Sequence, residues 1–448
     1  MSFPRYPSYK DSGVEWLGEV PGHWEVKPLK AVTTHNDDVL DETTAPDTEI
    51  AYVDISSVDG VNGINAKESM LFSAAPSRAR RRVKHGDVIV STVRTYLRAI
   101  ARIREPEDNL VVSTGFAVVR PRDALVPDFL GNVLSASYFV EQVIARSTGV
   151  SYPAINASEL VAIPVTVPPK AEQTAIAAFL DRETGKIDEL VAEQRRLMEL
   201  LKEKRQAVIS HAVTRGLHPA APRKPSGIEW LGDVPAHWTV QKIKHLVRSL
   251  EQGWSPQCEG YPAETEAEWG VLKVGCVNGG TFNPSENKVL PPELEPIPAL
   301  GIVSGDLLIS RANTRELVGS AAVADRDYRN LMLCDKLYRL RFVSDRCSPA
   351  FTCRYLGSTA VRGQIELGAT GASSSMVNIP QSAILELTIA APPLKEQCEI
   401  VAALDRELAK FDTLTAEAQR AIDLLQERRT ALISAAVTGQ IDMRDVNP

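Results

Sequence analysis

Apolar residues recur with a helical period over a long, proline-free stretch in the middle of the chain. The stretch runs from Lys170 to Gly216, and its apolar positions follow one another at steps of three, four and seven residues, which places them on one helix face. These positions are Ile187, Leu190, Leu197, Leu201 and Val208. Pro168 and Pro169 stand before the stretch and Gly216 ends it, as is typical of helix boundaries. The pattern predicts one helix of roughly 40 residues, about 60 Å long.

A second stretch with the same pattern closes the chain, 224 residues further on (397 − 173). It opens with the segment 392–397, Pro-Pro-Leu-Lys-Glu-Gln, where the first stretch has 168–173, Pro-Pro-Lys-Ala-Glu-Gln. Its apolar positions are Phe411, Leu414, Ala421, Leu425 and Leu432. Because each long helix needs a partner for its apolar stripe, we expect the two to pack as an antiparallel coiled coil. The correspondence also indicates that the chain is an internal duplication.

A turn element is repeated as well, at residues 12–24 and 226–238, with an offset of 214 (226 − 12). Two tryptophans, a glycine and a proline stand at fixed places in both copies, which predicts a compact turn with aromatic anchors. His23 and His237 lie within this element. We favour a packed turn histidine over a catalytic or metal-binding one, because no Cys, Asp or second His stands at a useful spacing from either.

Between each turn element and each long helix, short strand patterns come first and helical patterns follow. A Gly-Asp turn leads into an apolar strand in both halves, at Asp87 and Asp306, and a polar glycine loop precedes the last strand. This order predicts an α+β fold with two pseudo-repeated α/β domains separated by the two long helices. The expected boundaries are 1–24 for the N-terminal turn element, 25–167 for the first domain, 168–216 for the central helix, 217–238 for the repeated turn element, 239–391 for the second domain and 392–440 for the final helix.

The composition leaves room for more than one globular core, since the chain has 448 residues of which 44% are apolar. The segment 1–13 carries prolines and charges, and no apolar run reaches membrane-spanning length. We therefore expect a cytoplasmic protein. All six cysteines fall in the second half without a C-x-x-C motif, which favours reduced thiols over a zinc site or disulfides.

The motifs of common enzyme classes are missing from the sequence. There is no Walker A loop, no H-E-x-x-H, no G-x-S-x-G and no glycine-rich dinucleotide fingerprint. An Asn/Asp-Pro-Pro-Tyr/Phe segment of the kind that seats a target adenine in amino-methyltransferases is also missing. Asp54, Asp87 and Asp306 stand by strands without an acidic partner at short range, so we expect them to serve turns or caps. No catalytic residue and no metal ligand is predicted.

One segment is strongly basic although the formal net charge of the chain is −7. Between Arg78 and Arg104 there are nine Lys or Arg residues and one acid, Asp87. A charge run taken alone favours a solvated face, but Arg94–Arg98 directly follows the Gly-Asp strand, and we match it to Arg311–Arg315 in the second half. Because arginine and asparagine read guanine and adenine, and basic side chains bind phosphates, we predict a DNA-binding surface. The candidate DNA-binding residues are Arg78, Arg80, Arg81, Arg82, Lys84, Arg94, Thr95, Tyr96, Arg98, Ser151, Tyr152, Lys273, Arg311, Asn313, Thr314, Arg315, Ser373, Ser374 and Ser375.

The repeated turn element, the two Pro-Pro-x-x-Glu-Gln helix openings and the duplicated domains together resemble the specificity subunits of type I restriction-modification systems, over essentially the whole chain. The resemblance implies two target recognition domains, each of which reads one half of a bipartite, asymmetric double-stranded DNA target, while the helices set the unspecified gap. It implies that the chain itself is not catalytic. The implied partners are two methyltransferase subunits and restriction-translocase subunits, and S-adenosylmethionine, ATP and Mg²⁺ are expected to belong to those partners.

A different class of protein also fits part of the pattern. A coiled-coil scaffold whose repeated domains bind other proteins, without DNA specificity, explains the helices and the duplication but not the arginine segment. A nuclease or methyltransferase in its own right ranks third, because its motifs are missing.

Overall fold

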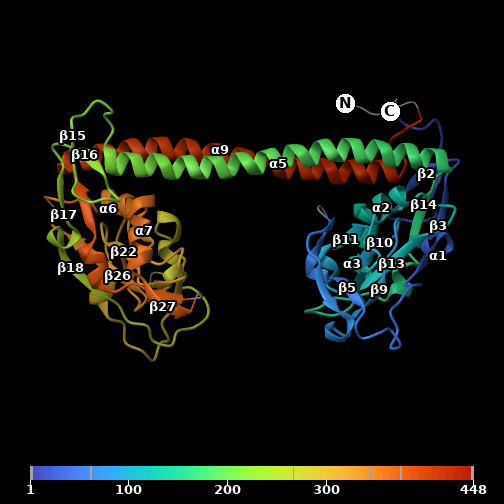
Figure 1. Cartoon of the computed structure of the whole chain (residues 1–448), viewed down its shortest axis with the longest axis horizontal. Helices are drawn as coiled ribbons and strands as arrows, with labels where there is room; N and C mark the ends of the chain where they lie inside the picture. The colour runs from blue at the N-terminus through green and yellow to red at the C-terminus, as the bar shows by residue number, and fades with distance from the viewer. Residues whose placement is uncertain (1–3, 61–62, 266, 344, 374–375, 445–448) are drawn as a thin grey trace. The chain divides into compact units, whose positions relative to one another are not determined.

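The computed structural model describes residues 4–60, 63–265, 267–343, 345–373 and 376–444. The chain forms two compact units: unit 1 comprises residues 1–195 and 419–448, and unit 2 comprises residues 196–418. Each unit holds a turn element, an α/β domain and one segment of each of two long helices (Figure 1). The predicted α+β fold, with two pseudo-repeated domains and two long helices, is confirmed.

The domain of unit 1 is built from two four-stranded sheets with helices packed on one of them. Its elements are β3 (Glu25–Pro28), α1 (Leu29–Val32), β4 (Thr33–His35), β5 (Glu49–Val53), β6 (Val58–Asp59), β7 (Gly63–Ile64), β8 (Glu68–Leu71), β9 (Ala79–Arg82), β10 (Val88–Ser91), β11 (Ile100–Arg102), β12 (Leu110–Ser113), β13 (Phe116–Pro121), α2 (Pro127–Ser135), α3 (Ser137–Arg146), α4 (Ala157–Leu160) and β14 (Pro164–Val167). The sheet orders are β11-β10-β13-β4 and β8-β5-β12-β9. Along β10, Val88 and Val90 pack with α2 and α3, whereas Ile89 packs with the second sheet. This strand is therefore buried on both faces.

The domain of unit 2 repeats this plan. Its elements are β17 (Thr239–Lys242), β18 (Val247–Gln252), β19 (Gly270–Leu272), β20 (Asn287–Val289), β21 (Gly301–Ile302), β22 (Leu307–Ser310), β23 (Ala312–Asn313), β24 (Ala321–Val323), β25 (Tyr328–Met332), β26 (Leu337–Phe342), α6 (Pro349–Leu356), α7 (Thr359–Gly368), β27 (Thr370–Ser373), β28 (Met376–Asn378), α8 (Gln381–Glu386) and β29 (Thr388–Ala391). The sheet orders are β18-β26-β22-β24 and β20-β19-β25-β21. Along β22, Leu307 and Ile309 pack with α6 and α7, whereas Leu308 packs with the second sheet. The strand β22 therefore occupies the place that β10 has in unit 1.

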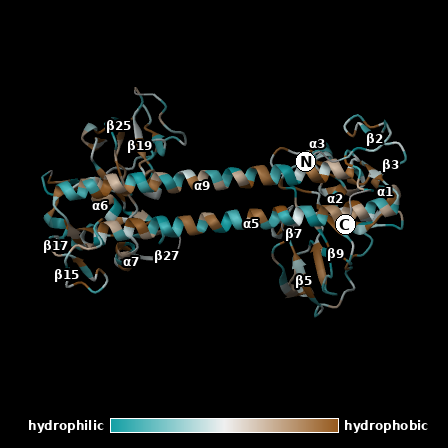
Figure 2. Cartoon of the chain, turned by 90° about the horizontal axis from the view of Figure 1, so that it is seen from above, coloured by the Kyte–Doolittle hydropathy of each residue, from teal (hydrophilic) through white to brown (hydrophobic). Residues whose placement is uncertain are grey.

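The long helices are α5 (Lys170–Arg215) and α9 (Leu394–Val437), and both begin directly after the predicted proline pairs. In each unit their segments lie side by side, with apolar bands between polar ones (Figure 2). No helix within the described ranges has an apolar stretch long enough to cross a membrane. The turn elements consist of two hairpins, β1 (Tyr9–Asp11) with β2 (Glu19–Pro21) and β15 (Arg223–Pro225) with β16 (Asp233–Pro235).

Each turn element is tied to the opening of a long helix by one glutamate. His23 Nε2 lies 2.7 Å from Glu172 Oε1, and Trp24 Nε1 donates a hydrogen bond to Glu172 Oε2 at 3.0 Å. Glu396 makes the same two contacts, at 2.7 and 3.0 Å, with His237 and the tryptophan that follows it. The two repeated motifs of the sequence therefore meet in space, and the histidines serve this contact.

The predicted apolar seam between the long helices is wrong at three positions. Leu190, Leu197 and Leu414 are 51, 41 and 45% exposed. From the buried Ile187, the seam continues at Val191, four residues on, and not at Leu190, three residues on. Positions i+3 and i+4 lie on opposite sides of position i on a helix, and the partner helix covers the i+4 side. The periodicity therefore identified the stripe but not which edge of it is covered.

An equivalent ion pair joins α5 to α9 in each unit. In unit 1, Arg429 of α9 donates to the two carboxylate oxygens of Asp188 in α5, at 2.9 and 3.3 Å. In unit 2, Arg205 of α5 pairs with Asp412 of α9. The repeat of 224 residues relates Asp188 to Asp412 and Arg205 to Arg429 (412 − 188; 429 − 205). The duplication therefore reproduces the ion pair: α5 supplies the aspartate in unit 1, and α9 supplies it in unit 2. A later residue of α5 pairs with an earlier residue of α9, which means that the helices run antiparallel.

Candidate nucleic-acid interface

Two surface loops of unit 1 that are far apart in the sequence meet beside the end of β10. The β10 loop (residues 92–99) contains a short 3₁₀ turn, and the α3 loop (residues 147–155) follows α3. The Arg94 N–H donates to the Pro153 carbonyl at 2.8 Å, and Thr95 Oγ1 lies 2.8 Å from Ser147 Oγ. A strand-like bridge joins Val93 to residue 154. The two loops therefore form one surface.

The exposed side chains of this loop pair include cationic, aromatic and hydroxyl groups. Arg94, Tyr96 and Arg98 are exposed on the β10 loop, and Ser151 and Tyr152 are exposed on the α3 loop. The guanidinium carbon of Arg94 lies 4.8 Å from the centroid of the Tyr152 ring, a cation–π distance. Thr95 is buried and holds the loop, so its side chain serves the loop contact and is not presented at the surface.

Two arginines of the β10 loop have strained backbones. Arg94 and Arg98 have φ angles of 51° and 52°, in the left-handed region that side chains other than glycine rarely adopt. Each such residue costs about 1–2 kcal/mol, and strain of this kind clusters at functional sites because the surrounding structure must hold it. The loop is thus held in one shape by its contacts with the α3 loop.

The remainder of the basic run is occupied mainly in contacts within the domain. Arg78 pairs with Asp54 at 2.7 Å, and Lys84 pairs with Asp38 at 3.0 Å. Arg81 donates to Asn36 Oδ1 and to the Phe116 carbonyl, and burial lowers its pKa. Arg80 lies over the Phe72 ring, whereas the Arg82 side chain is exposed. Within the described ranges, no hydrogen bond or ion pair joins the side chains of Arg78, Arg80, Arg81, Arg82 or Lys84 to either loop. The acids that pair with the run come from distant segments, which the local count of one acid omitted.

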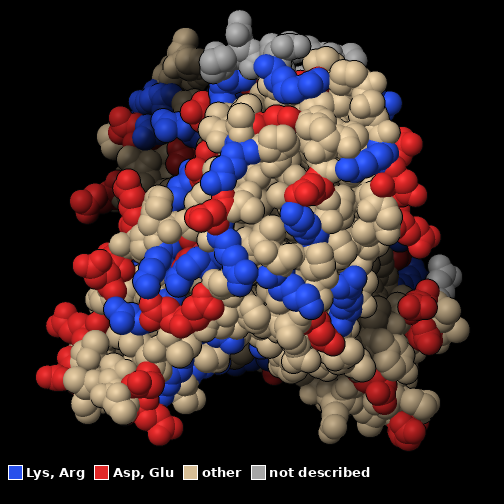
Figure 3. Space-filling view, turned by 90° about the vertical axis from the view of Figure 1, so that its right-hand side faces the viewer, with Lys and Arg blue, Asp and Glu red and all other residues tan. Residues whose placement is uncertain are grey.

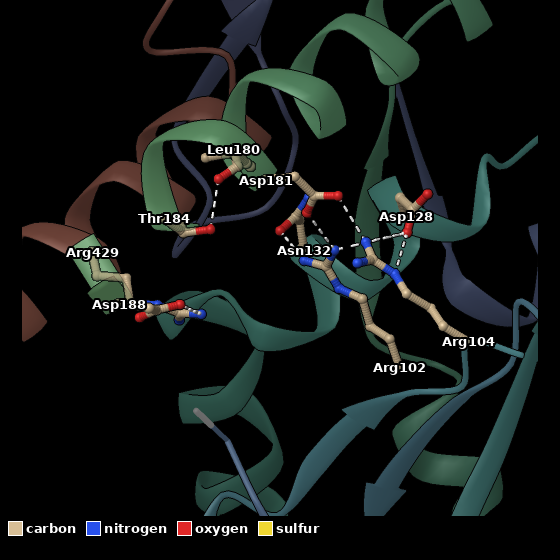
Figure 4. A network of polar contacts seen from close by, with 9 residues as sticks. All are labelled: Arg102, Arg104, Asp128, Asn132, Leu180, Asp181, Thr184, Asp188 and Arg429. Atoms are coloured by element: carbon tan, nitrogen blue, oxygen red, sulfur yellow. Dashed lines mark hydrogen bonds and ion pairs between the residues drawn. The ribbon is translucent and has the colours of Figure 1, made fainter. Parts of the chain in front are cut away.

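Arg102 and Arg104, at the end of the run, tie the first sheet to the long helix. Both point toward Asp181 of α5, at 3.0 and 2.7 Å, and Arg104 also binds Asp128 of α2 (Figure 4). Burial lowers the pKa of Arg102, while the hydrogen bond to Asp128 raises the pKa of Arg104. In unit 2, Arg354 of α6 makes the corresponding contact, at 3.0 Å to Asp405 of α9. These arginines are therefore structural.

Figure 3 shows how charged side chains are distributed over one face of the molecule. Lys and Arg side chains are spread over it among Asp and Glu side chains and do not merge into one uninterrupted basic patch. On this face, therefore, the basic side chains form no uniform positive surface.

Unit 2 brings the corresponding loops together as a small sheet. The β22 loop (residues 311–320) contains β23, which pairs with β28 of the α7 loop (residues 369–379), and β28 pairs with β27. Asn313 Oδ1 accepts from the Thr314 N–H at 2.9 Å, and Asn313 Nδ2 lies 3.4 Å from Asn278 Oδ1. Thr314 and Arg315 are exposed.

The other candidate DNA-binding residues of unit 2 are half-buried, are described through their backbone alone, or lie outside the described residues. Arg311 is half-buried and donates to the Asp335 carbonyl at 2.9 Å. Lys273 is half-buried and precedes the 3₁₀ segment Val274–Gly280. Ser373 pairs through its backbone with Met376, while Ser374 and Ser375 lie outside the described residues.

The strand register corrects the match between the two loops. The N–H of Ile155 donates to the Thr92 carbonyl at 2.9 Å, and the N–H of Ile379 donates to the Arg311 carbonyl at 2.9 Å. Ser91 pairs with Phe116 as Ser310 pairs with Leu337. Arg311 therefore stands where unit 1 has Thr92. The residue that stands at the place of Arg94 is Asn313. Matching arginine to arginine in the sequence shifted the alignment by two residues.

The aspartates considered as metal ligands cap turns, as predicted. Asp54 accepts from the Ile55 N–H at 2.7 Å. Asp87 accepts from the Lys84 N–H at 2.7 Å and binds Arg120, and Asp306 accepts from the Val303 N–H at 3.0 Å and binds Arg341. The hydrogen bond from Arg120 to Asp87 raises the pKa of Arg120, and the hydrogen bond from Arg341 to Asp306 raises the pKa of Arg341. In the part of the chain that the structure describes, no group of three or more His, Cys, Asp or Glu is placed to hold a metal ion.

The fold and the loop pairs define a class: a duplicated α/β protein whose two domains share a scaffold and differ in their surface loops. Residues 21–197 match a family model described as the type I restriction modification DNA specificity domain. Residues 21–197 therefore carry a DNA specificity domain of this family, and the chain as a whole is similar to the specificity subunits of type I restriction enzymes.

Three curated relatives illustrate the similarity. The EcoKI specificity subunit of Escherichia coli K12 is 24% identical over 328 residues, which cover 72% of this chain and 68% of that subunit. A putative subunit of Methanocaldococcus jannaschii, MjaX, is 22% identical over 443 residues, 96% of both chains. The EcoEI specificity subunit of Escherichia coli is 28% identical over 205 residues, and this chain spans only 34% of its length.

Two solved structures share the fold. A chain from a study of complex assembly and conformational transition of the type I R-M system has a TM-score of 0.70 at 24% identity, with 93% of this chain and 98% of that chain covered. The HsdS subunit of Thermoanaerobacter tengcongensis has a TM-score of 0.50 at 24% identity, with 94 and 98% covered. The matches support the specificity-subunit hypothesis and not the scaffold without DNA specificity.

Sequence reasoning missed one residue of this surface. Asn278 reaches the side chain of Asn313 from a different loop, and the two are 35 residues apart along the chain. No periodicity or motif links them. The 3₁₀ segment Val274–Gly280, which holds Asn278, packs against β22 and β24, and this tertiary contact places it beside the β22 loop.

Proposed function

We propose that the chain is the DNA sequence-specificity subunit of a type I restriction-modification complex. Each unit binds one half of a bipartite, asymmetric double-stranded DNA target through its loop pair. Arginine side chains contact phosphates and fix the position on the duplex, and a few loop side chains choose bases.

One observation carries this proposal: the two domains share a strand register and present different side chains on it. The β10 loop presents Arg94, Tyr96 and Arg98, whereas the β22 loop presents Asn313 and Arg315 at a comparable place. A shared scaffold approaches DNA in the same way in both units, while different side chains bind different base edges. Two identical loops would read the same sequence twice, so the difference favours an asymmetric target.

We infer that the chain binds DNA without catalysing a reaction on it. Two methyltransferase subunits and restriction-translocase subunits supply the chemistry, and S-adenosylmethionine, ATP and Mg²⁺ belong to those partners. The support is that the curated relatives are named as specificity subunits of type I restriction enzymes. Purified full-length chain incubated with DNA and S-adenosylmethionine is expected to transfer no methyl group, and transfer without a partner would contradict this inference.

We infer further that the long helices set the gap between the two half-sites. The ion pairs Asp188–Arg429 and Arg205–Asp412 each fix the sliding position of α5 against α9 within one unit. A helix rises about 1.5 Å per residue and resists bending, so paired helices suit a spacer of constant length.

The test is methylation mapping of host DNA by long-read sequencing, with this gene intact and with it deleted. We expect that methylation at one bipartite motif disappears on deletion and returns when the gene is restored. A methylome that is unchanged in a strain that methylates DNA through this locus would contradict the proposed function.

A further inference from the structure

Arg94 of unit 1 and Asn313 of unit 2 occupy the same position on the repeated scaffold. Each stands three residues after a serine that ends the buried central strand, Ser91 or Ser310. Each lies beside the strand-like segment that closes its loop pair, since Arg94 donates its N–H to residue 153 and Asn313 pairs with Val377. The position is therefore fixed from two sides in both units.

We propose that this shared position is the purine-reading position of each unit: Arg94 reads a guanine in one half-site and Asn313 reads an adenine in the other. The inference rests on the proposed function and adds which residue determines specificity in each half. Guanine offers the acceptors N7 and O6 in the major groove, which suit a guanidinium. Adenine offers the acceptor N7 and an N6 donor, which suit a carboxamide.

The surroundings of Arg94 leave its hydrogen-bonding edge available. Its guanidinium carbon lies over the Tyr152 ring, 4.8 Å from the ring centroid. This cation–π contact is not a hydrogen bond to an acceptor atom, and the N–H donors of a guanidinium point outward in its plane. Within the described ranges, no side-chain hydrogen bond of Arg94 to the protein is found, while its backbone is held at a φ of 51°. Tyr152 thus positions Arg94 without consuming its donors.

The surroundings of Asn313 orient its amide and leave half of its capacity free. The Thr314 N–H donates to Oδ1 at 2.9 Å, which identifies the oxygen, and Nδ2 lies 3.4 Å from Asn278 Oδ1. A carboxamide oxygen has two lone pairs and its nitrogen has two N–H groups, so one acceptor and one donor remain. One acceptor and one donor are what adenine N6 and N7 require.

The neighbouring candidates are less suited to this role. Arg311 stands where unit 1 has the buried Thr92, and its side chain is bound to the Asp335 carbonyl. Arg98 stands where unit 2 has Gly319, with φ angles of 52° and 72°, one residue before the loop rejoins the sheet. Arg98 therefore closes the loop in unit 1, at a place that has no side chain in unit 2.

The test uses the full chain expressed from its own locus with its native partners, and long-read sequencing of the methylated motif. The variants are Arg94→Ala and Asn313→Ala, with Arg122→Ala and Arg248→Ala, exposed arginines outside both loop pairs, as controls. We expect that Arg94→Ala relaxes one G·C pair in one half-site, with discrimination lowered about 10- to 100-fold, and leaves the other half unchanged. Asn313→Ala is expected to relax one A·T pair in the opposite half. The controls keep the motif.

The outcomes separate this inference from the proposed function. A wild-type strain without a motif that depends on the gene overturns both. A wild-type bipartite motif that neither variant alters, or that both variants alter in the same half, overturns the inference alone. If Arg94→Ala abolishes methylation, Arg94→Gln decides, since a carboxamide suits adenine and not guanine. A motif in which that one guanine position is relaxed or changed supports the inference. An unchanged motif, or loss of methylation with both substitutions, overturns it, because a residue that reads one base pair is not essential for all binding.

Discussion

The carboxylate of Glu172, at the start of α5, joins this helix to the segment before β1 and to the segment after β2. It accepts from Tyr6 OH and Trp24 Nε1, both at 3.0 Å, and lies 2.7 Å from His23 Nε2. Burial, together with the Glu172 carboxylate, raises the pKa of Tyr6, so the phenol remains a donor. Trp24 is fully buried, which leaves its N–H without access to water. Removal of the carboxylate would leave that donor unsatisfied.

We therefore predict that Glu172→Ala destabilises unit 1 by about 1–3 kcal/mol, the cost of leaving a buried donor unpaired. Thermal unfolding followed by tryptophan fluorescence is the measurement, with Glu15→Ala, an exposed glutamate of the same turn element, as control. Glu396→Ala is expected to cost less, because Glu396 has no tyrosine partner among the described residues. Equal midpoints for the Glu172 and Glu15 variants would contradict the account.

Residues whose partners are near in sequence could be predicted, and those whose partners are distant could not. The cap of Asp87 joins it to a residue three positions away, so the local Gly-Asp pattern was sufficient. Arg102 binds Asp181, and the two are 79 residues apart, so the acid that pairs with Arg102 lies far outside the basic segment. The position of Arg94 beside Tyr152 likewise depends on the bridge between two loops. Its chemistry was visible in the sequence, but its equivalence to Asn313 was not.

At the scale of elements, the long helices were predicted from periodicity, proline pairs and glycine stops, and these signals are local. Which edge of the stripe is covered depends on the partner helix. Ile187 and Val191 are buried, whereas Leu190 is half exposed. Seven-residue steps from Leu190 reach Leu197 and Lys204, and those from Val191 reach Met198 and Arg205, so the pattern alone did not separate the two edges.

This difference gives a matched pair of substitutions. Val191→Ala removes two buried methyl groups and is expected to lower the free energy of unfolding by about 1–2 kcal/mol, whereas Leu190→Ala is expected to change it by less than about 0.5 kcal/mol. Chemical denaturation of the purified chain measures both. A larger loss for the leucine variant would show that the seam lies on the other edge of the stripe.

The long helices are also expected to set the length of the gap between the half-sites. Residues 194–200 of α5 and 417–423 of α9 lie between the two ion pairs, and their joint deletion removes one heptad from both helices while keeping the seam in register. The deletion shortens each helix by about 10 Å. We expect the variant to fold and to lose the original gap, while any motif that it methylates keeps both half-sites. Retention of the original gap length would contradict the role of the helices as a spacer.

At the scale of the whole molecule, internal repeats made most of the fold predictable. The offsets of 224 and 214 residues identified two copies of each part before any strand was placed. The repeats did not predict that the turn element contacts the helix opening in each unit. Two motifs can recur together in a sequence without touching in the structure. The division of each long helix between two units was likewise hidden, since a sequence pattern marks a helix as one segment.

The central claim is that each unit reads one half of a bipartite target independently of the other. The most direct measurement is the methylated motif, by long-read sequencing, of a strain in which residues 239–391 are replaced by the corresponding segment of a family relative with a different target. The account predicts that the half-site read by unit 1 and the gap remain, while the other half-site changes to that of the relative. A motif that changes in both halves, or in neither, would contradict it.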